Sequence, residues 1–231
     1  MKELGYFFII ITLFAIGLLV NSVWKSEASG LRRSSLLIFF VLMFWFLLQG
    51  FLSYNGIYSQ NLKELPPKIF VIGIFPMIAL NLIVFFHTKG KLFIDNLPLK
   101  ELTFLNILRI PIEIVLYKLF LYKQIPEVMT FTGRNFDILA GLSAPLIIFL
   151  VWRKNQFRKV LLLIWNFFAL ALLINIVSTA ILSSPSAFQQ FGFDQPNIAI
   201  LNFPFSFLPT VIVPIVFFGH FVSIRQLWNQ K

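Results

Sequence analysis

Arg109 and Glu113 stand four residues apart inside a run of aliphatic and aromatic residues, where ionised side chains are costly. On an α-helix, residues four apart share one face and differ in height by about 6 Å. An arginine and a glutamate so placed can neutralise each other, bind a polar ligand or relay a proton. We therefore take this pair as the first candidate site.

The two charges belong to a longer polar stripe. Thr103, Asn106 and Tyr117 continue the same helix face at spacings of three and four residues. Because a polar face is unfavourable against lipid, this one is expected to face the interior of a helical bundle or a water-filled cavity. Pro111 removes a backbone hydrogen bond between the two charges, and Arg109 is a candidate donor to the carbonyl left free.

Polar residues in other apolar segments are candidate partners of the pair. Asn81, Asn166 and Asn175 each interrupt a different hydrophobic run. Each one can form a simple hydrogen bond between helices. Together they can line a polar core around Arg109 and Glu113, so Asn81 and Asn175 are included in the predicted binding set with Asn106 and Tyr117.

A second polar cluster occupies residues 130–141, "TFTGRNFDILAG". Thr132 or Asn135 can cap the helix that follows, and Asp137 suits the positive end of a helix dipole. Arg134 can pair with Asp137 or bind an anionic lipid headgroup. The capping interpretation explains most of the cluster, but Arg134 and Asp137 stay as secondary binding candidates at the outer face.

Catalytic and metal motifs are not recognisable. The sequence has no cysteine, which excludes disulfides, thiolate catalysis and thiolate metal ligands. Ser143 and His220 are unsuited as nucleophile and base, because their predicted depths from the outer helix ends are about 9 Å and about 20 Å. His87 and His220 are both expected at the cytoplasmic interface, and neither has a carboxylate within one helical turn. We predict no metal, no cofactor and no nucleic-acid partner.

Long apolar segments must position these residues. Of the 231 residues, 58% are hydrophobic and 12% are charged, and the hydrophobic residues form blocks of about 17 to 25 residues, enough to cross a bilayer. The first segment has no cleavage site after it and is expected to remain as a span. The predicted spans are Leu4–Val20, Leu36–Ser53, Ile69–Phe86, Leu102–Tyr122, Phe136–Trp152, Val160–Leu182 and Phe207–Ile224.

The predicted fold class is therefore all-α: a polytopic integral membrane protein that forms one domain, residues 1–231, with seven transmembrane helices. Several helices are expected to be kinked. Internal prolines occur in four of the segments, namely Pro76, Pro111, Pro145 and Pro214.

The distribution of basic residues predicts the orientation. With seven spans, the loops on one side hold six lysines and arginines and those on the other hold twelve. The positive-inside rule then places the N-terminus outside the cell and the C-terminus in the cytoplasm. The expected location is the cell membrane. The connection Ser183–Ser206 has no basic residue and falls outside, where it is either a lid over a cavity or a passive interfacial cap.

Three functions fit these observations. The first is a multi-pass protein, such as a transporter, that binds or passes a small solute, ion or proton at Arg109 and Glu113. The second is a structural or assembly subunit of a membrane complex, with the two charges as an internal ion-pair lock. The third is a membrane-embedded enzyme that acts on lipid through Glu113. Expected partners are the lipid bilayer, a small-molecule or ion ligand, and other membrane subunits.

Overall fold

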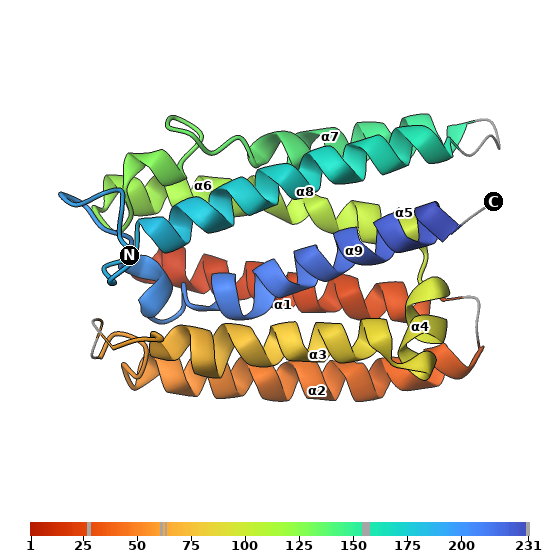
Figure 1. The fold of residues 1–231 in the computed structure, drawn as a ribbon, viewed down its shortest axis with the longest axis horizontal. Helices are drawn as coiled ribbons and strands as arrows, with labels where there is room; N and C mark the ends of the chain where they lie inside the picture. The colour runs from red at the N-terminus through yellow and green to blue at the C-terminus, as the bar shows by residue number, and fades with distance from the viewer. Residues whose placement is uncertain (27–28, 61, 63, 154–157, 230–231) are drawn as a thin grey trace.

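The computed structural model describes residues 1–26, 29–60, 62, 64–153 and 158–229 (Figure 1). Within these residues the secondary structure is helical, without strands, and the long helices run side by side along the longest axis. The long helices are α1 (Lys2–Trp24), α2 (Ser29–Tyr54), α3 (Phe75–Phe86), α6 (Arg109–Leu121), α7 (Ile138–Val151), α8 (Lys159–Leu182) and α9 (Val213–Asn229). The shorter ones are α4 (Thr88–Asp95) and α5 (Leu99–Phe104).

Five of the predicted spans coincide with helices that are long and apolar enough to cross a membrane. They cover Lys2–Trp24, Ser34–Tyr54, Ile69–Phe86, Lys159–Leu182 and Leu208–Asn229. The predicted span at Leu102–Tyr122 is built from α5, the 3₁₀ turn η2 (Leu105–Leu108) and α6, which follow one another without a break. This composite helix carries the buried charges Arg109 and Glu113.

Helix α7 is shorter than its predicted span. Its 14 residues rise about 21 Å, less than the roughly 30 Å of a hydrocarbon core. The segment between α6 and α7 runs along the bundle before α7 begins (Figure 1). Met129, Thr130 and Asn135 of this segment are buried. Irregular backbone at such a depth is tolerated where protein covers it.

Pro76 changes the helix that precedes it. Proline lacks the amide proton that would bond to the carbonyl four residues earlier, here Ile72. The residues before Pro76 form a π-helix, η1 (Ile69–Ile74), and Gln49 Nε2 of α2 donates to the Ile72 carbonyl at 3.2 Å. Tyr58 donates its hydroxyl to Gln49 Oε1. Burial raises the pKa of Tyr58 to about 12, which keeps this donor protonated.

Pro214 produces the same arrangement in α9. A second π-helix, η6 (Leu208–Ile212), precedes it, and the carbonyl that Pro214 leaves free is that of Thr210. Trp45 Nε1 of α2 donates to this carbonyl at 2.9 Å. The two π-helices pack closely, because a Cβ on Gly73 would lie 2.6 Å from Thr210 Cγ2. Side chains of α2 thus compensate two proline-broken helices at their point of contact.

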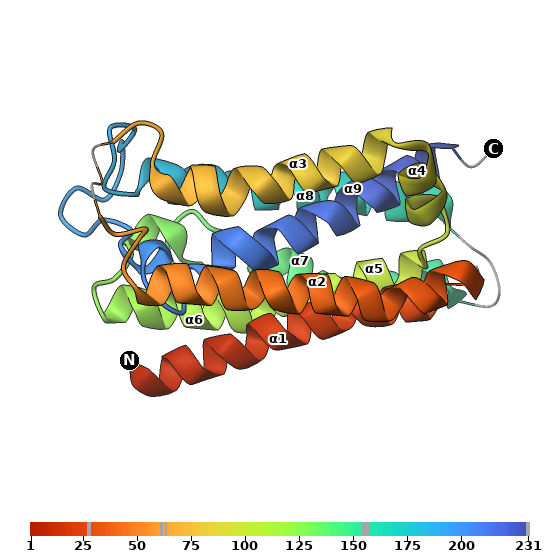
Figure 2. The ribbon, with the colours of Figure 1, turned by 90° about the horizontal axis from the view of Figure 1, so that it is seen from below.

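Helix α9 occupies the middle of the bundle in both views (Figures 1 and 2). In the most apolar stretch of Leu208–Asn229, 61% of the residues are buried, against 17% in Ile69–Phe86. Helix α3 is therefore peripheral, and it leaves space between itself and α8.

The connection Ser183–Ser206 folds back onto the bundle. Gln195 Nε2 donates to the carbonyls of Phe120 and Ile125 at 2.9 and 2.6 Å, which ties it to the end of α6. Its 3₁₀ turn η5 (Ala199–Leu201) is buried. The connection is therefore packed against the protein over this part of its length.

Candidate functional site

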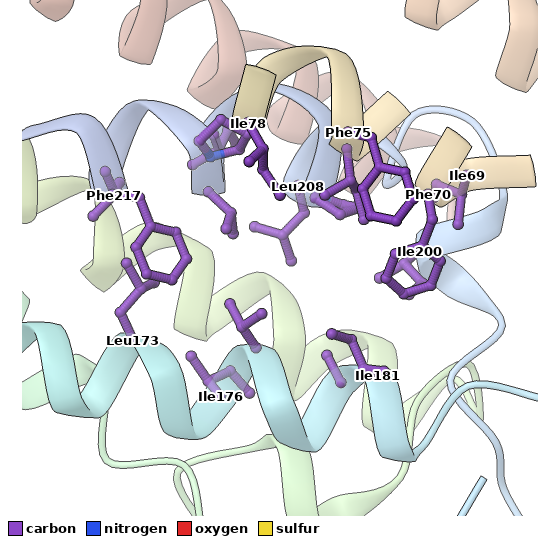
Figure 3. Close-up of a pocket in the computed structure, with 18 of the residues that line it drawn as sticks. Ile69, Phe70, Phe75, Ile78, Leu173, Ile176, Ile181, Ile200, Leu208 and Phe217 are labelled. Atoms are coloured by element: carbon purple, nitrogen blue, oxygen red, sulfur yellow. The ribbon is translucent and has the colours of Figure 1, made fainter. Parts of the chain in front are cut away.

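A cavity of about 900 Å³ lies between α3, α8 and α9. Figure 3 shows Leu173, Ile176 and Ile181 of α8 opposite Phe75 and Ile78 of α3. Most of the lining is aliphatic or aromatic. The exceptions include three ionisable residues of the composite helix and the N-terminus of α7, namely Arg109, Glu113 and Asp137.

Arg109 is the centre of a buried hydrogen-bond network. Its side chain is 2% exposed, and Nη1 donates to Asp137 Oδ1 at 2.7 Å and to the Ala169 carbonyl of α8 at 2.9 Å. Its Nη2 lies 2.8 Å from Nε2 of His220 in α9. One guanidinium therefore joins α6 to α7, α8 and α9, and it does so in the fork geometry that lets arginine bind several acceptors at once.

The network fixes the tautomer of His220. A guanidinium has no acceptor, so His220 Nε2 must accept from Arg109 through its lone pair. The proton of a neutral ring then sits on Nδ1, which lies 2.9 Å from Asn166 Oδ1. Asn166 Oδ1 accepts this bond while its Nδ2 donates to the Leu162 carbonyl at 2.9 Å. Every polar atom of the two side chains is satisfied by this arrangement.

Glu113 is held by an amide instead of a cation. Both carboxylate oxygens accept from Asn135 Nδ2, at 2.6 and 2.7 Å, and the Met129 carbonyl lies 3.0 Å from the same nitrogen. Asn135 Oδ1 accepts from the backbone amide of Asp137 at 3.0 Å. The segment before α7 therefore orients both carboxylates, Glu113 through a side chain and Asp137 through the backbone.

Close packing of α7 against the composite helix depends on Gly141. A Cβ at this position would lie 2.9 Å from Ile110 Cγ1 and 3.2 Å from Arg109 Cβ. Such distances force neighbouring atoms to move, so a glycine permits the approach. This approach brings the N-terminus of α7, with Asp137, within reach of the guanidinium.

The ion-pair prediction needs correction. Arg109 pairs with Asp137, and among the described residues no ion pair joins Arg109 to Glu113. The four-residue spacing correctly places both charges in the interior, where Glu113 is 1% exposed. It gave no information on a competing carboxylate from another helix, and Asp137 offers Arg109 a direct charged hydrogen bond.

Three other predicted binding residues make contacts of their own. Asn106 is buried, but its Nδ2 donates to the carbonyl of Thr103 at 3.2 Å, on its own helix. Tyr117 is half-buried and stacks on Phe131 with ring centroids 4.9 Å apart. Asn81 lines the cavity from α3.

The remaining predicted pair meets outside the buried network. Asn175 is exposed on α8 and donates through Nδ2 to the backbone carbonyl of Arg134 at 3.0 Å. Arg134 is also exposed, and the described residues include no ion pair between it and Asp137. Asp137 occupies the N-cap position of α7, but its carboxylate turns to Arg109 and makes no side-chain capping bond.

Sequence reasoning missed the role of His220. We expected it at the cytoplasmic interface near His87, but it is fully buried and bonded to Arg109. The prediction was wrong because the last helix runs five residues past its predicted end at Ile224, so that His220 is near the middle of Leu208–Asn229. A histidine that far inside an apolar segment was the available signal.

In the described residues no group of three His, Asp or Glu side chains is placed to hold a metal ion.

Comparison with known proteins gives one match. Residues 66–228 match the family described as Domain of unknown function (DUF8737), and the chain belongs to this family. No curated protein and no solved structure matches the chain.

Proposed function

We propose that this member of the family is an integral membrane protein that crosses the bilayer seven times and binds a small ligand in the cavity beside Arg109 and Glu113. The observation that carries the proposal is the cavity of about 900 Å³, which reaches three buried ionisable groups at the depth of the apolar helices. A pocket of this size, mostly apolar with a few convergent polar groups, is typical of ligand sites. Buried ionisable groups in membrane segments are commonly functional.

The seven-span topology has support from the path of the chain. The N-terminus and the end of α9 lie at opposite ends of the bundle, as an odd number of passes requires (Figure 1). The composite helix and α7 complete the count beyond the five long apolar helices. With the excess of basic residues on one side, we propose an outer N-terminus and a cytoplasmic C-terminus in the cell membrane.

The natural absence of cysteine provides a direct test of the cavity. Ile176→Cys places a thiol in the cavity wall, and Leu19→Cys places one in the core, away from the cavity lining. In native membranes we expect N-ethylmaleimide to modify the first and spare the second. Equal protection of both thiols would show that nothing the size of this reagent reaches the cavity.

The same background tests the topology. In intact cells, a membrane-impermeant maleimide should label Lys2→Cys, while Arg153→Cys should react only after the cells are opened. The reverse pattern, or labelling of both from outside, would contradict the proposed orientation.

The Arg109–Asp137 ion pair favours a second candidate, a structural subunit whose buried pair locks the helices together. It differs from the pair expected from the sequence only in the carboxylate involved. A chain whose sole role is structural would co-purify with a stoichiometric membrane partner. A substitution that fills its cavity would not weaken the binding of any ligand. We favour ligand binding because a lock does not require a cavity at the charges.

A further inference from the structure

The charges beside the cavity do not balance. Arg109 is bound to Asp137, and in the part of the chain that the structure describes the hydrogen-bond partner of the Glu113 carboxylate is the neutral amide of Asn135. His220 accepts a bond from Arg109, so it adds no positive charge. The cluster thus contains one guanidinium and two carboxylates.

A buried carboxylate without a cationic partner is costly unless it takes up a proton or meets a cation, so a positive charge is one way to complete the cluster. Two further basic residues line the cavity, Lys68 directly before η1 and Arg225 near the end of α9. Arg225 is bound by Asp95 through two contacts of 2.9 Å. Within the described residues no ion pair connects either of them to Glu113. The positive charge is therefore not supplied by the cavity wall.

Arg109 also has an unfilled polar position. In the described part of the molecule its Nε is buried and has no hydrogen-bond partner. Buried donors in native proteins are nearly always satisfied, by protein, by water or by a ligand. This N–H needs an acceptor oxygen, such as that of a water molecule that enters the cluster with the ligand.

The shape of the cavity indicates the rest of the ligand. Its lining includes Leu208 and Asn229, the first and last residues of the η6–α9 helix, which rises about 33 Å over this length. This length is close to the thickness of a hydrocarbon core. Leu173, Ile176 and Phe217 give the wall an apolar surface along that path (Figure 3). An aliphatic chain matches this surface.

We infer that the cavity binds a cationic amphiphile, with a single aliphatic chain along α8 and α9 and an ammonium head at Glu113. This inference rests on the ligand-binding function proposed above. An anionic lipid would place a third negative charge beside Asp137 and Glu113. A neutral lipid would leave the Glu113 charge uncompensated, so the ammonium group is the feature that gives selectivity.

Dodecylamine and 1-dodecanol test the inference, because they share a chain and differ in the charge of the head at pH 7. Their binding to the purified protein is measured by native mass spectrometry and by the shift of its thermal unfolding. We expect the wild type to bind the amine at least about tenfold more tightly, since a hydrogen bond to a charged group is worth about that factor. Glu113→Gln should remove the preference, and Leu173→Trp should remove binding of both.

Each outcome decides a separate point. Equal binding of amine and alcohol by the wild type would overturn the cationic ligand but leave the proposed cavity function intact. A Glu113→Gln protein that keeps the tenfold preference would overturn Glu113 as the binding group. If Leu173→Trp folds and binds both probes as the wild type does, the proposed function fails as well. The wild-type comparison requires no variant, so it remains decisive if a substitution prevents folding.

Discussion

The partner of Arg109 can be determined by a double-mutant cycle with Arg109→Met and Asp137→Leu. Either single change leaves one charge of the 2.7 Å pair buried without its partner. Breaking a buried pair in this way costs about 3–5 kcal/mol of unfolding free energy. The double variant has no buried charge left at the pair and loses mainly the bonds to His220 and to the Ala169 carbonyl, together about 1–3 kcal/mol.

These magnitudes predict strong coupling. The two single losses add to about 6–10 kcal/mol, so the double variant should be at least about 3 kcal/mol more stable than their sum. Unfolding in mixed micelles with increasing sodium dodecyl sulfate, followed by tryptophan fluorescence, measures each free energy. Circular dichroism must give the same transition if the unfolding is two-state.

A matched cycle with Arg109→Met and Glu113→Leu is the control, because Glu113 is hydrogen-bonded to Asn135 and not to Arg109. Its coupling energy should be smaller than that of the Arg109–Asp137 cycle. Additivity within about 0.5 kcal/mol for Arg109 and Asp137 would refute the assigned ion pair. A larger coupling in the control cycle would restore the pair expected from the sequence.

Three further predictions concern packing and hydrogen bonding. Gly141→Ala should lower the free energy of unfolding by about 1–3 kcal/mol, because its Cβ would contact Ile110. The control Gly17→Ala, whose Cβ would have no atom within 4 Å, should raise it by up to about 1 kcal/mol. Equal stability of the two variants in the same unfolding assay would contradict the close packing. Gln49→Leu leaves the Ile72 carbonyl and the buried Tyr58 hydroxyl without their partner, and it should cost about 1–3 kcal/mol of unfolding free energy in that assay. An unchanged transition would argue against these two contacts. Nitrogen-15 NMR of labelled histidine should find the His220 proton on Nδ1; a proton on Nε2 would rule out the bond from Arg109.

Local pattern was sufficient for the helical class and for the inner face of the composite helix. Blocks of apolar residues predict helices because a bilayer leaves the backbone few other ways to satisfy its hydrogen bonds. Arg109 and Glu113 share a buried face because helical periodicity is a property of the local chain. Pro76 and Pro214 were also readable as disruptions, since the missing amide proton is intrinsic to the residue, whereas Pro145 lies inside α7 without ending it.

Contacts between distant segments were decided by the tertiary structure alone. Asp137 reaches Arg109 because α7 begins deep in the bundle and Gly141 allows it to approach. His220 reaches the same guanidinium because α9 continues to Asn229, beyond its predicted end at Ile224, which leaves His220 near the middle of the helix. Sequence spacing reports neighbours within one helix, but depth and rotation relative to other helices depend on how all the helices pack. For that reason the sequence placed the charges in the interior, and only the fold determined which of them meet and left Glu113 facing a cavity.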